Sequence, residues 1–186
     1  MTNYILGLDI STSVIGMAIM DKDFKLVTYR NLKMDSKDDL EIRAWQFKEI
    51  VKELFLTYSF KAVFVEEPAM MFGSGKTTAQ TMSKLQRFNG MCCYAVYSET
   101  LLIPQLVHPS SARKKMNISV PRIVKNKKEF IIKEVEKKYP NFIYELTKQG
   151  NPKPGTDDIA DAIVIAYYGV SSILEGEYVS GEDKNS

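Results

Sequence analysis

Cysteine and histidine are scarce in this sequence. Its 186 residues include two cysteines and one histidine. Because Cys92 and Cys93 are adjacent in a segment with helical periodicity, they cannot form a disulfide framework or a spaced zinc site, and we interpret them as buried or half-buried thiols. The one histidine, His108, stands just before Pro109 at the end of an expected strand, where a structural role is favoured. These absences exclude a metal centre built from histidine and cysteine ligands.

Long apolar runs and a basic leader are also missing. No apolar run approaches the ~20 residues that a bilayer-spanning helix needs, and Met1 is followed almost directly by the apolar residues 4–6. We therefore expect a cytoplasmic protein without a membrane partner. The length, with 45% hydrophobic and 26% charged residues, fits a single domain around one core. We expect that domain at 1–174, followed by a flexible polar tail at 175–186.

The net charge of +2 is too small to identify a partner, but the charges are unevenly distributed. Residues 113–138 carry ten Lys and Arg against three Glu. A local excess of this size suits a surface that binds a phosphate backbone, although a solvated helix at 126–138 would carry similar residues. Charge alone therefore leaves nucleic-acid binding as one of two interpretations.

Strand and helix patterns alternate along the chain. Residues 4–10, 14–20 and 24–32 are expected to form three antiparallel strands, and apolar residues from 38 onward recur at helical spacing. A short apolar run at 61–66 fits a buried strand parallel to the first one after a helical crossover. This order predicts an α/β fold with a mixed five-stranded sheet, three antiparallel strands plus parallel strands, flanked by helices. The remaining expected elements are a helix at 77–97, a strand at 101–108, and helices at 126–138 and 156–170.

Two strands end in carboxylates whose surroundings are apolar. Asp9 lies near the end of the first expected strand, where a lone buried charge is costly, so it needs a partner unless it only bonds the turn at Ser11 and Thr12. Glu66 ends the strand expected to lie parallel to the first, which would bring it beside Asp9. Glu67 should point to the opposite face because side chains alternate along a strand. The residues alone leave open which of these two glutamates is functional.

The last expected helix carries the most informative acids. Asp158 and Asp161 are three residues apart, on a face that continues through apolar residues, so both should look inward. Asp157 and Asp158 could instead complement the helix dipole behind an N-cap at Thr156, an effect of ~0.3–1 kcal/mol each. Asp161 lies beyond the first turn, among alanines and branched apolar residues. That explanation therefore fails for Asp161, and a paired or metal-bound carboxylate is favoured.

Carboxylates from two strands and a helix would form the oxygen-rich site that hard divalent cations require. Mg²⁺ prefers carboxylates, water and substrate phosphate, and two such ions ~4 Å apart can hold the attacking and the leaving oxygen of a phosphodiester. A bound ion would also lower the pKa of a water molecule and supply hydroxide. The sequence therefore favours metal-dependent phosphodiester chemistry.

Three motifs carry a resemblance to a known family. They are Gly7-Leu8-Asp9-Ile10-Ser11, Val65-Glu66-Glu67-Pro68 and Asp158-Ile159-Ala160-Asp161-Ala162. In this order and at these distances they resemble the acidic tetrad of RuvC-type Holliday-junction resolvases, nucleases with an RNase H-like fold, over residues 4–169. The resemblance makes 1–174 a RuvC-like nuclease domain and selects the first glutamate as the ligand. The catalytic residues and metal ligands that it implies are Asp9, Glu66, Asp158 and Asp161.

The resemblance also implies a cofactor, a substrate and an assembly. Mg²⁺ is the expected cofactor, with Mn²⁺ able to substitute. The implied activity is that of a crossover-junction endonuclease of recombination and repair, which cuts four-way or branched DNA by paired, symmetric nicks and leaves ligatable 5′-phosphate and 3′-hydroxyl ends. A homodimer is implied, and we expect it to form through the helix at 77–97. A phage or prophage source would fit so compact a version, acting in the cytoplasm of a bacterial host.

Further residues are expected to contact branched DNA. The resemblance makes Phe72, in the loop after Pro68, the residue that wedges against unstacked bases, although it could instead fold back onto its own helix. Lys76 in the same loop is expected to touch phosphate. Because the family places basic residues near the scissile phosphate, Lys127 and Lys128 are also predicted to act in catalysis. The DNA contacts predicted in the basic segment are Arg113, Lys114, Lys115, Lys125, Lys127 and Lys128.

Several other interpretations compete with this one. The segment 73–78 invites a phosphate-loop assignment but lacks the required glycine, because Met70 stands in that place. The segment 9–13 resembles the first phosphate loop of sugar kinases and actin-like ATPases, yet those folds need two such domains. A nuclease acting on RNA–DNA hybrids or on less selective branched DNA, and a non-catalytic junction-binding protein, remain alternatives.

Overall fold

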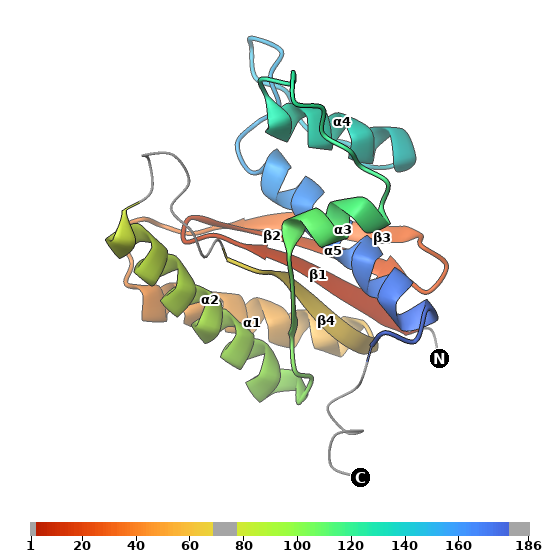
Figure 1. The fold of residues 1–186 in the computed structure, drawn as a ribbon. Helices are drawn as coiled ribbons and strands as arrows, with labels where there is room; N and C mark the ends of the chain where they lie inside the picture. Colours follow the sequence, from red (N-terminus) through yellow and green to blue (C-terminus); the bar gives the residue numbers. More distant parts are fainter. Residues whose placement is uncertain (1–2, 69–77, 179–186) are drawn as a thin grey trace.

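The computed structural model describes residues 3–68 and 78–178, and a twisted five-stranded sheet lies at its centre (Figure 1). The strand order is β3-β2-β1-β4-β5. β2 pairs antiparallel with β1 and β3, whereas β4 pairs parallel with β1 and β5 parallel with β4. The predicted mixed sheet is therefore confirmed. The strands are β1 (Tyr4–Ile10), β2 (Val14–Asp21), β3 (Leu26–Lys33), β4 (Phe60–Glu66) and β5 (Gln105–Val107).

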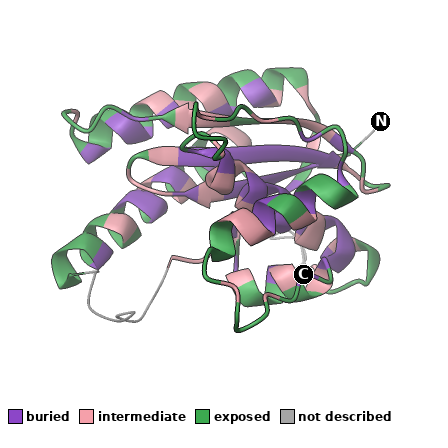
Figure 2. Cartoon of the chain, turned by 90° about the horizontal axis from the view of Figure 1, so that it is seen from above, coloured by how far each residue is buried: buried purple, intermediate pink, exposed green. Residues whose placement is uncertain are grey.

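Helices cover both faces of the sheet (Figure 1). α1 and α2 pack on one face, and α3, α4 and α5 lie on the other. Figure 2 shows the buried residues concentrated in the strands and on the helix faces turned toward them. Among the helices in the described ranges, none is both long and apolar enough to cross a membrane. The helices are α1 (Leu40–Thr57), α2 (Ala79–Thr100), α3 (Pro109–Lys115), α4 (Lys127–Lys138) and α5 (Thr156–Leu174).

Three local expectations are corrected. The strand expected at 101–108 is only the three residues of β5, and α2 runs on to Thr100, where Leu101 ends it in a left-handed conformation. The helix α3 was not expected, and His108 caps it by accepting a hydrogen bond from the backbone N–H of Ser110, which agrees with a structural role for this histidine. Gly155, in the left-handed region at φ 95°, precedes α5 as its N-cap, so Thr156 is the first helical residue and not the cap.

Helix α5 approaches the sheet unusually closely because glycines face it. A Cβ atom on Gly7 of β1 would lie 2.4 Å from the backbone oxygen of Ala162, and one on Gly16 of β2 would lie 2.0 Å from the backbone oxygen of Asp158. Side chains at these positions would push the helix away from the strands. The glycines therefore fix the height of the first turns of α5 above β1 and β2.

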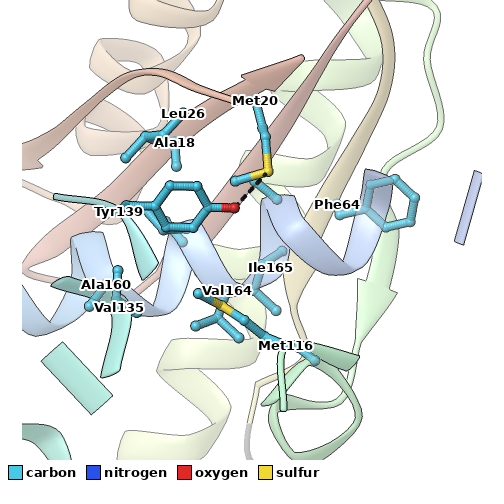
Figure 3. Packing of buried hydrophobic residues seen from close by; sticks show 14 of the residues in the cluster. Ala18, Met20, Leu26, Phe64, Met116, Val135, Tyr139, Ala160, Val164 and Ile165 are labelled. Atoms are coloured by element: carbon cyan, nitrogen blue, oxygen red, sulfur yellow. Dashed lines mark hydrogen bonds between the residues drawn. The ribbon is translucent and has the colours of Figure 1, made fainter. Parts of the chain in front are cut away.

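The core on this face ties α4 to α5 and the sheet (Figure 3). Tyr139, at the end of α4, is buried and points its hydroxyl at the sulfur of Met20 on β2, 3.6 Å away. Ile131, Ile132 and Val135 of α4 are buried in the same cluster. This packing anchors α4, so the N-terminal end of the helix is held close to the start of α5.

Candidate active site

Strand alternation places Asp9 and Glu66 on the face of the sheet that α5 covers. Gly7, two residues before Asp9, abuts the backbone of α5, so Asp9 projects to the same face. Phe64, two residues before Glu66, lies in the core cluster under α5. Glu66 therefore projects beneath α5 as well, whereas Glu67 alternates away. The residues alone left open whether Glu66 or Glu67 is functional. In the structure, Glu66 is the one that lies beside Asp9.

Strand register brings these carboxylates to the same level as the start of α5. β1 and β4 pair in parallel up to the residues just before Asp9 and Glu66. On its other side, Asp9 is paired with Gly16 of β2. Because Gly16 abuts the backbone of Asp158, the first turn of α5 sits directly over this end of β1 and β2.

The acids of α5 complete the cluster. Asp158 and Asp161 are partly buried, and both raise the pKa of Asp9 through charge repulsion. The side chain of Asp161 is only 17% exposed although it carries a carboxylate. The expectation that both acids look inward is confirmed. We call Asp9, Glu66, Asp158 and Asp161 the carboxylate cluster.

Burial and mutual repulsion make this cluster hard to ionise. Burial raises the pKa of Asp9 well above its ordinary value, and repulsion from Glu66 and Asp161 adds to the rise. Burial, followed by repulsion from Asp161, raises the pKa of Glu66 to about 7. Burial and the neighbouring Asp157 raise the pKa of Asp158 to about 6. Such concentrated, partly dehydrated negative charge needs cations to balance it.

Two basic side chains supply part of that balance. The guanidinium of Arg113 on α3 lies 3.4 Å from a carboxylate oxygen of Asp161, and Arg113 opposes the rise that burial causes in the pKa of Asp161. Lys128, at the start of α4, forms an ion pair with Asp157 at the rim of the cluster. Lys128 also lowers the pKa of Glu66 and of Asp158. Both residues were predicted near the reacting phosphate, and both lie beside the carboxylates.

The chemistry of the cluster fits a hard divalent cation. Its donors are all carboxylate oxygens, the ligands that such ions prefer, and a bound cation would relieve the repulsion that helps to raise their pKa values. Within the described residues, no three acidic, histidine or cysteine side chains are already arranged as a coordination shell. Ionic contacts with Arg113 and Lys128 engage Asp161 and Asp157 instead.

The other predicted basic residues have different surroundings. Lys114 is exposed on α3, and Lys125 and Lys127 are exposed near the start of α4. Lys115 is paired with Glu175 and Glu177 beyond the far end of α5, which does not fit a contact next to the carboxylates.

These ion pairs also hold the first residues after α5, where a flexible tail was expected. The rest of that tail, 179–186, lies outside the described residues. Phe72 and Lys76 lie outside the described residues too.

Sequence reasoning missed one determinant of the site, Gly16. In the sequence it looks like an ordinary strand glycine, and only the contact with the backbone of Asp158 shows why a side chain is forbidden there. A glycine within an otherwise apolar strand is a signal of close backbone approach. That signal could have pointed to the helix that covers the strand.

Removing one carboxylate should stabilise the metal-free protein at alkaline pH. The pKa of Glu66 is about 7 in the folded protein against an ordinary 4.5, so folding favours the protonated acid. The stability that Glu66 contributes is complete below pH 4.5 and is lost as the pH rises through 7. In EDTA, we expect Glu66→Gln to raise the free energy of unfolding at pH 8 by about 2–3 kcal/mol and to change it little at pH 4.5.

Urea denaturation at both pH values measures this effect, with Glu67→Gln as the matched control that keeps the wild-type pH dependence. A Glu66→Gln variant that is no more stable than wild type at pH 8 in EDTA would contradict the assignment of Glu66 to a buried, mutually repelling cluster.

Comparisons with known proteins place this geometry in a class of folds. No family model matches the sequence, and no curated protein matches it. Among solved structures, the chain is similar to RuvC from T. thermophilus in complex with a Holliday junction substrate, with a TM-score of 0.67 and 16% identity over 96% of this chain and 99% of that chain. The yeast mitochondrial Holliday junction resolvase gives a TM-score of 0.55 and 15% identity over 97% of this chain and 83% of that chain.

The fowlpox virus resolvase, solved with Holliday junction DNA, is also similar, with a TM-score of 0.51 and 14% identity over 92% of this chain and 99% of that chain. The sheet and its helices therefore define an RNase H-like α/β fold. More specifically, this chain has the fold of the RuvC-type resolvases, along nearly the whole length of both proteins. The resemblance drawn from the three motifs is thus confirmed for the fold.

Proposed function

We propose that this chain is a metal-dependent endodeoxyribonuclease that resolves four-way or branched DNA by paired nicks. The observation that carries the proposal is the convergence of Asp9, Glu66, Asp158 and Asp161 from two strands and a helix into one partly buried cluster. The RuvC-type fold supports it, because two of the similar structures were solved with junction DNA.

The cluster would hold Mg²⁺ or Mn²⁺ through its carboxylate oxygens. Bound there, the ions would supply a hydroxide nucleophile and Lewis-acid stabilisation of the leaving oxygen of a phosphodiester. Asp9 and Glu66 are positioned by the ends of paired strands, and Asp158 and Asp161 by a helix fixed against Gly7 and Gly16. Such rigid placement keeps the donors oriented before substrate arrives.

The basic residues around the cluster would bind the DNA backbone. Arg113 and Lys128 already lie beside the carboxylates, so they can stabilise charge on a phosphate at the site. Lys114, Lys125 and Lys127 are exposed and free to contact phosphates further along the strand. Phe72 and Lys76 remain predicted contacts of the loop after β4.

The substrate class is tested with three labelled nucleic acids of the same sequence, a four-way junction, a linear duplex and an RNA–DNA hybrid. Each is incubated with the protein in Mg²⁺ and in EDTA. We expect cleavage of the junction in Mg²⁺ alone, with at most a trace on the other two. Preferential cleavage of the hybrid or the duplex would overturn the junction assignment but keep the nuclease. Tight junction binding without cleavage in Mg²⁺ or Mn²⁺ would instead indicate a structural junction-binding protein.

We further propose a homodimer formed through α2 and the adjacent face of α1. Large apolar side chains are exposed on both helices and at the end of α2, with Trp45 60%, Tyr94 70% and Leu101 76% exposed. Tyrosine and tryptophan at such exposure are typical of protein–protein interfaces. A dimer would also give one protein two carboxylate clusters, as two coordinated nicks require.

Tyr94→Glu is expected to convert the dimer into a monomer, because it places a charge in the apolar interface. Sedimentation velocity at micromolar protein should show a shift to the monomer mass. The matched control is Ile123→Glu, since Ile123 is 89% exposed on the segment between α3 and α4 and should leave the mass unchanged. A wild type that sediments as a monomer at all concentrations would refute the proposed assembly.

A further inference from the structure

Helix α3 presents three consecutive cations to three different surroundings. Arg113 faces Asp161 in the carboxylate cluster, Lys114 is exposed, and Lys115 pairs with Glu175 and Glu177. Of these three residues, Arg113 is therefore the one that contacts the carboxylate cluster.

The backbone that carries Arg113 is firmly held. Ala112 and Met116 on either side of it are buried in the core under α5. The carbonyl of Arg113 accepts a hydrogen bond of 2.8 Å from the backbone N–H of Ile118. Since its main chain is anchored, Arg113 can change partners only by moving its side chain.

The contact between Arg113 and Asp161 is incomplete. One guanidinium nitrogen, Nη2, lies 3.4 Å from one oxygen of Asp161, longer than the ~2.7–2.9 Å of a strong charge-assisted hydrogen bond. The Nε of Arg113 is buried and has no hydrogen-bond partner among the residues that the structure describes. A guanidinium can form a two-pronged pair with a carboxylate, yet here it makes a single long contact. Arg113 thus neutralises Asp161 without binding it tightly.

The position of Arg113 also puts its charge next to a second member of the cluster. Its positive charge acts on Glu66 as well as on Asp161. The guanidinium of Arg113 therefore interacts electrostatically with the same carboxylates that would bind a divalent cation.

We propose that Arg113 is a built-in counter-ion, which occupies Asp161 in the metal-free protein and competes with the divalent cation for that carboxylate. The inference rests on the proposed metal site and adds to it a residue that sets metal affinity. Arg113 is a positioning residue in this role, because it acts through Asp161. When a metal ion binds, the guanidinium of Arg113 releases Asp161 and can instead donate hydrogen bonds to a DNA phosphate at the site. Metal and DNA should therefore bind cooperatively.

The test is calorimetric titration of the full chain with Mn²⁺ in the absence of DNA. We expect Arg113→Gln to bind Mn²⁺ about 5- to 10-fold more tightly than wild type, because the competing charge is gone. Arg113→Lys keeps the charge and should stay within about twofold of wild type. Lys22→Gln, the matched control at an exposed position between β2 and β3, removes one positive charge and should not change the affinity.

Thermal melting gives an independent readout on the same variants. In EDTA, Arg113→Gln should melt at a lower temperature than wild type, because the carboxylates lose a counter-ion, and Mn²⁺ should raise its Tm by more than it raises that of wild type. Arg113→Met, with an apolar stem in the buried position, replaces the glutamine variant if the latter does not fold.

Two outcomes would overturn the proposal, and they are distinguishable. Equal or weaker Mn²⁺ binding by Arg113→Gln, with normal binding by wild type, would show that Arg113 does not compete with metal, while the proposed nuclease site would stand. If wild type itself binds no Mn²⁺ at millimolar concentration, the metal site fails and the counter-ion role fails with it.

Discussion

Asp161→Asn is expected to reduce junction cleavage by about a thousandfold or more while the protein still folds and binds the junction. The carboxylate of Asp161 lies among Asp9, Glu66 and Asp158, and its side chain is only 17% exposed. An amide is nearly the same size but carries no charge, so the donor set would lose a metal ligand without losing its shape. Single-turnover cleavage of a labelled four-way junction in Mg²⁺ measures the effect.

The control for this variant is Asp23→Asn, at an exposed turn between β2 and β3. It removes the same charge from the same protein and should cleave as wild type does. Circular dichroism and a junction-binding assay establish that Asp161→Asn is folded and still engages DNA. Cleavage by Asp161→Asn within about tenfold of wild type would remove Asp161 from the proposed metal ligands.

Gly16→Ala is expected to lower the free energy of unfolding by about 3 kcal/mol or more, the second large effect. The added Cβ would lie 2.0 Å from the backbone oxygen of Asp158 and 2.3 Å from its carbonyl carbon. Both atoms belong to the backbone of α5, so no side-chain rotation can relieve the overlap. The start of α5 would have to lift from β2, which would also displace Asp158 and Asp161 from Asp9. Urea denaturation and junction cleavage should therefore both show a loss.

Gly90→Ala is the matched control for Gly16→Ala. Gly90 lies within α2, and a Cβ there would meet no atom of the described part of the chain within 4 Å. Because alanine favours the helix more than glycine does, we expect this variant to be as stable as wild type or up to ~1 kcal/mol more stable. If Gly16→Ala proved as stable as Gly90→Ala, the close seating of α5 on β2 would not hold.

The architecture was largely predictable because its signals are local and periodic. Apolar runs separated by polar turns marked β1 and β2, and an apolar run between charged ends marked β4. A carboxylate at the end of a strand or in an apolar helix face is costly unless it has partners, which is why Asp9 and Asp161 could be singled out before their proximity was known. The predicted strand order, with β4 parallel to β1, then placed the carboxylates at the ends of these two strands side by side.

The elements that were mispredicted or missed depend on contacts between distant segments. A strand was expected at 101–108, but only the three residues of β5 pair with β4. The short helix α3 depends on His108 as a cap and on Ala112 and Met116 packing under α5. A helix of seven residues is too short for a helical apolar periodicity to be recognised in the sequence.

Side-chain pairing in the basic segment was equally inaccessible. The sequence gives no way to distinguish the three consecutive cations Arg113, Lys114 and Lys115. In the helix, each of them has a different environment. Only the structure separates Lys115, which ties down Glu175 and Glu177, from Arg113 at the carboxylates. The family resemblance selected Glu66 over Glu67, but the residues alone could not, because that choice requires knowing which face of the sheet α5 covers.

The most direct test of the central claim is to map the cuts that the wild-type protein makes in a four-way junction with each strand labelled in turn. In Mg²⁺, we expect nicks at symmetric positions in two opposing strands, with 5′-phosphate and 3′-hydroxyl ends that DNA ligase can seal, and no nicks in EDTA. Cleavage that persists unchanged in EDTA, or an intact junction after prolonged incubation of folded, DNA-bound protein in Mg²⁺ and in Mn²⁺, would contradict the account of the carboxylate cluster as a metal-dependent nuclease centre.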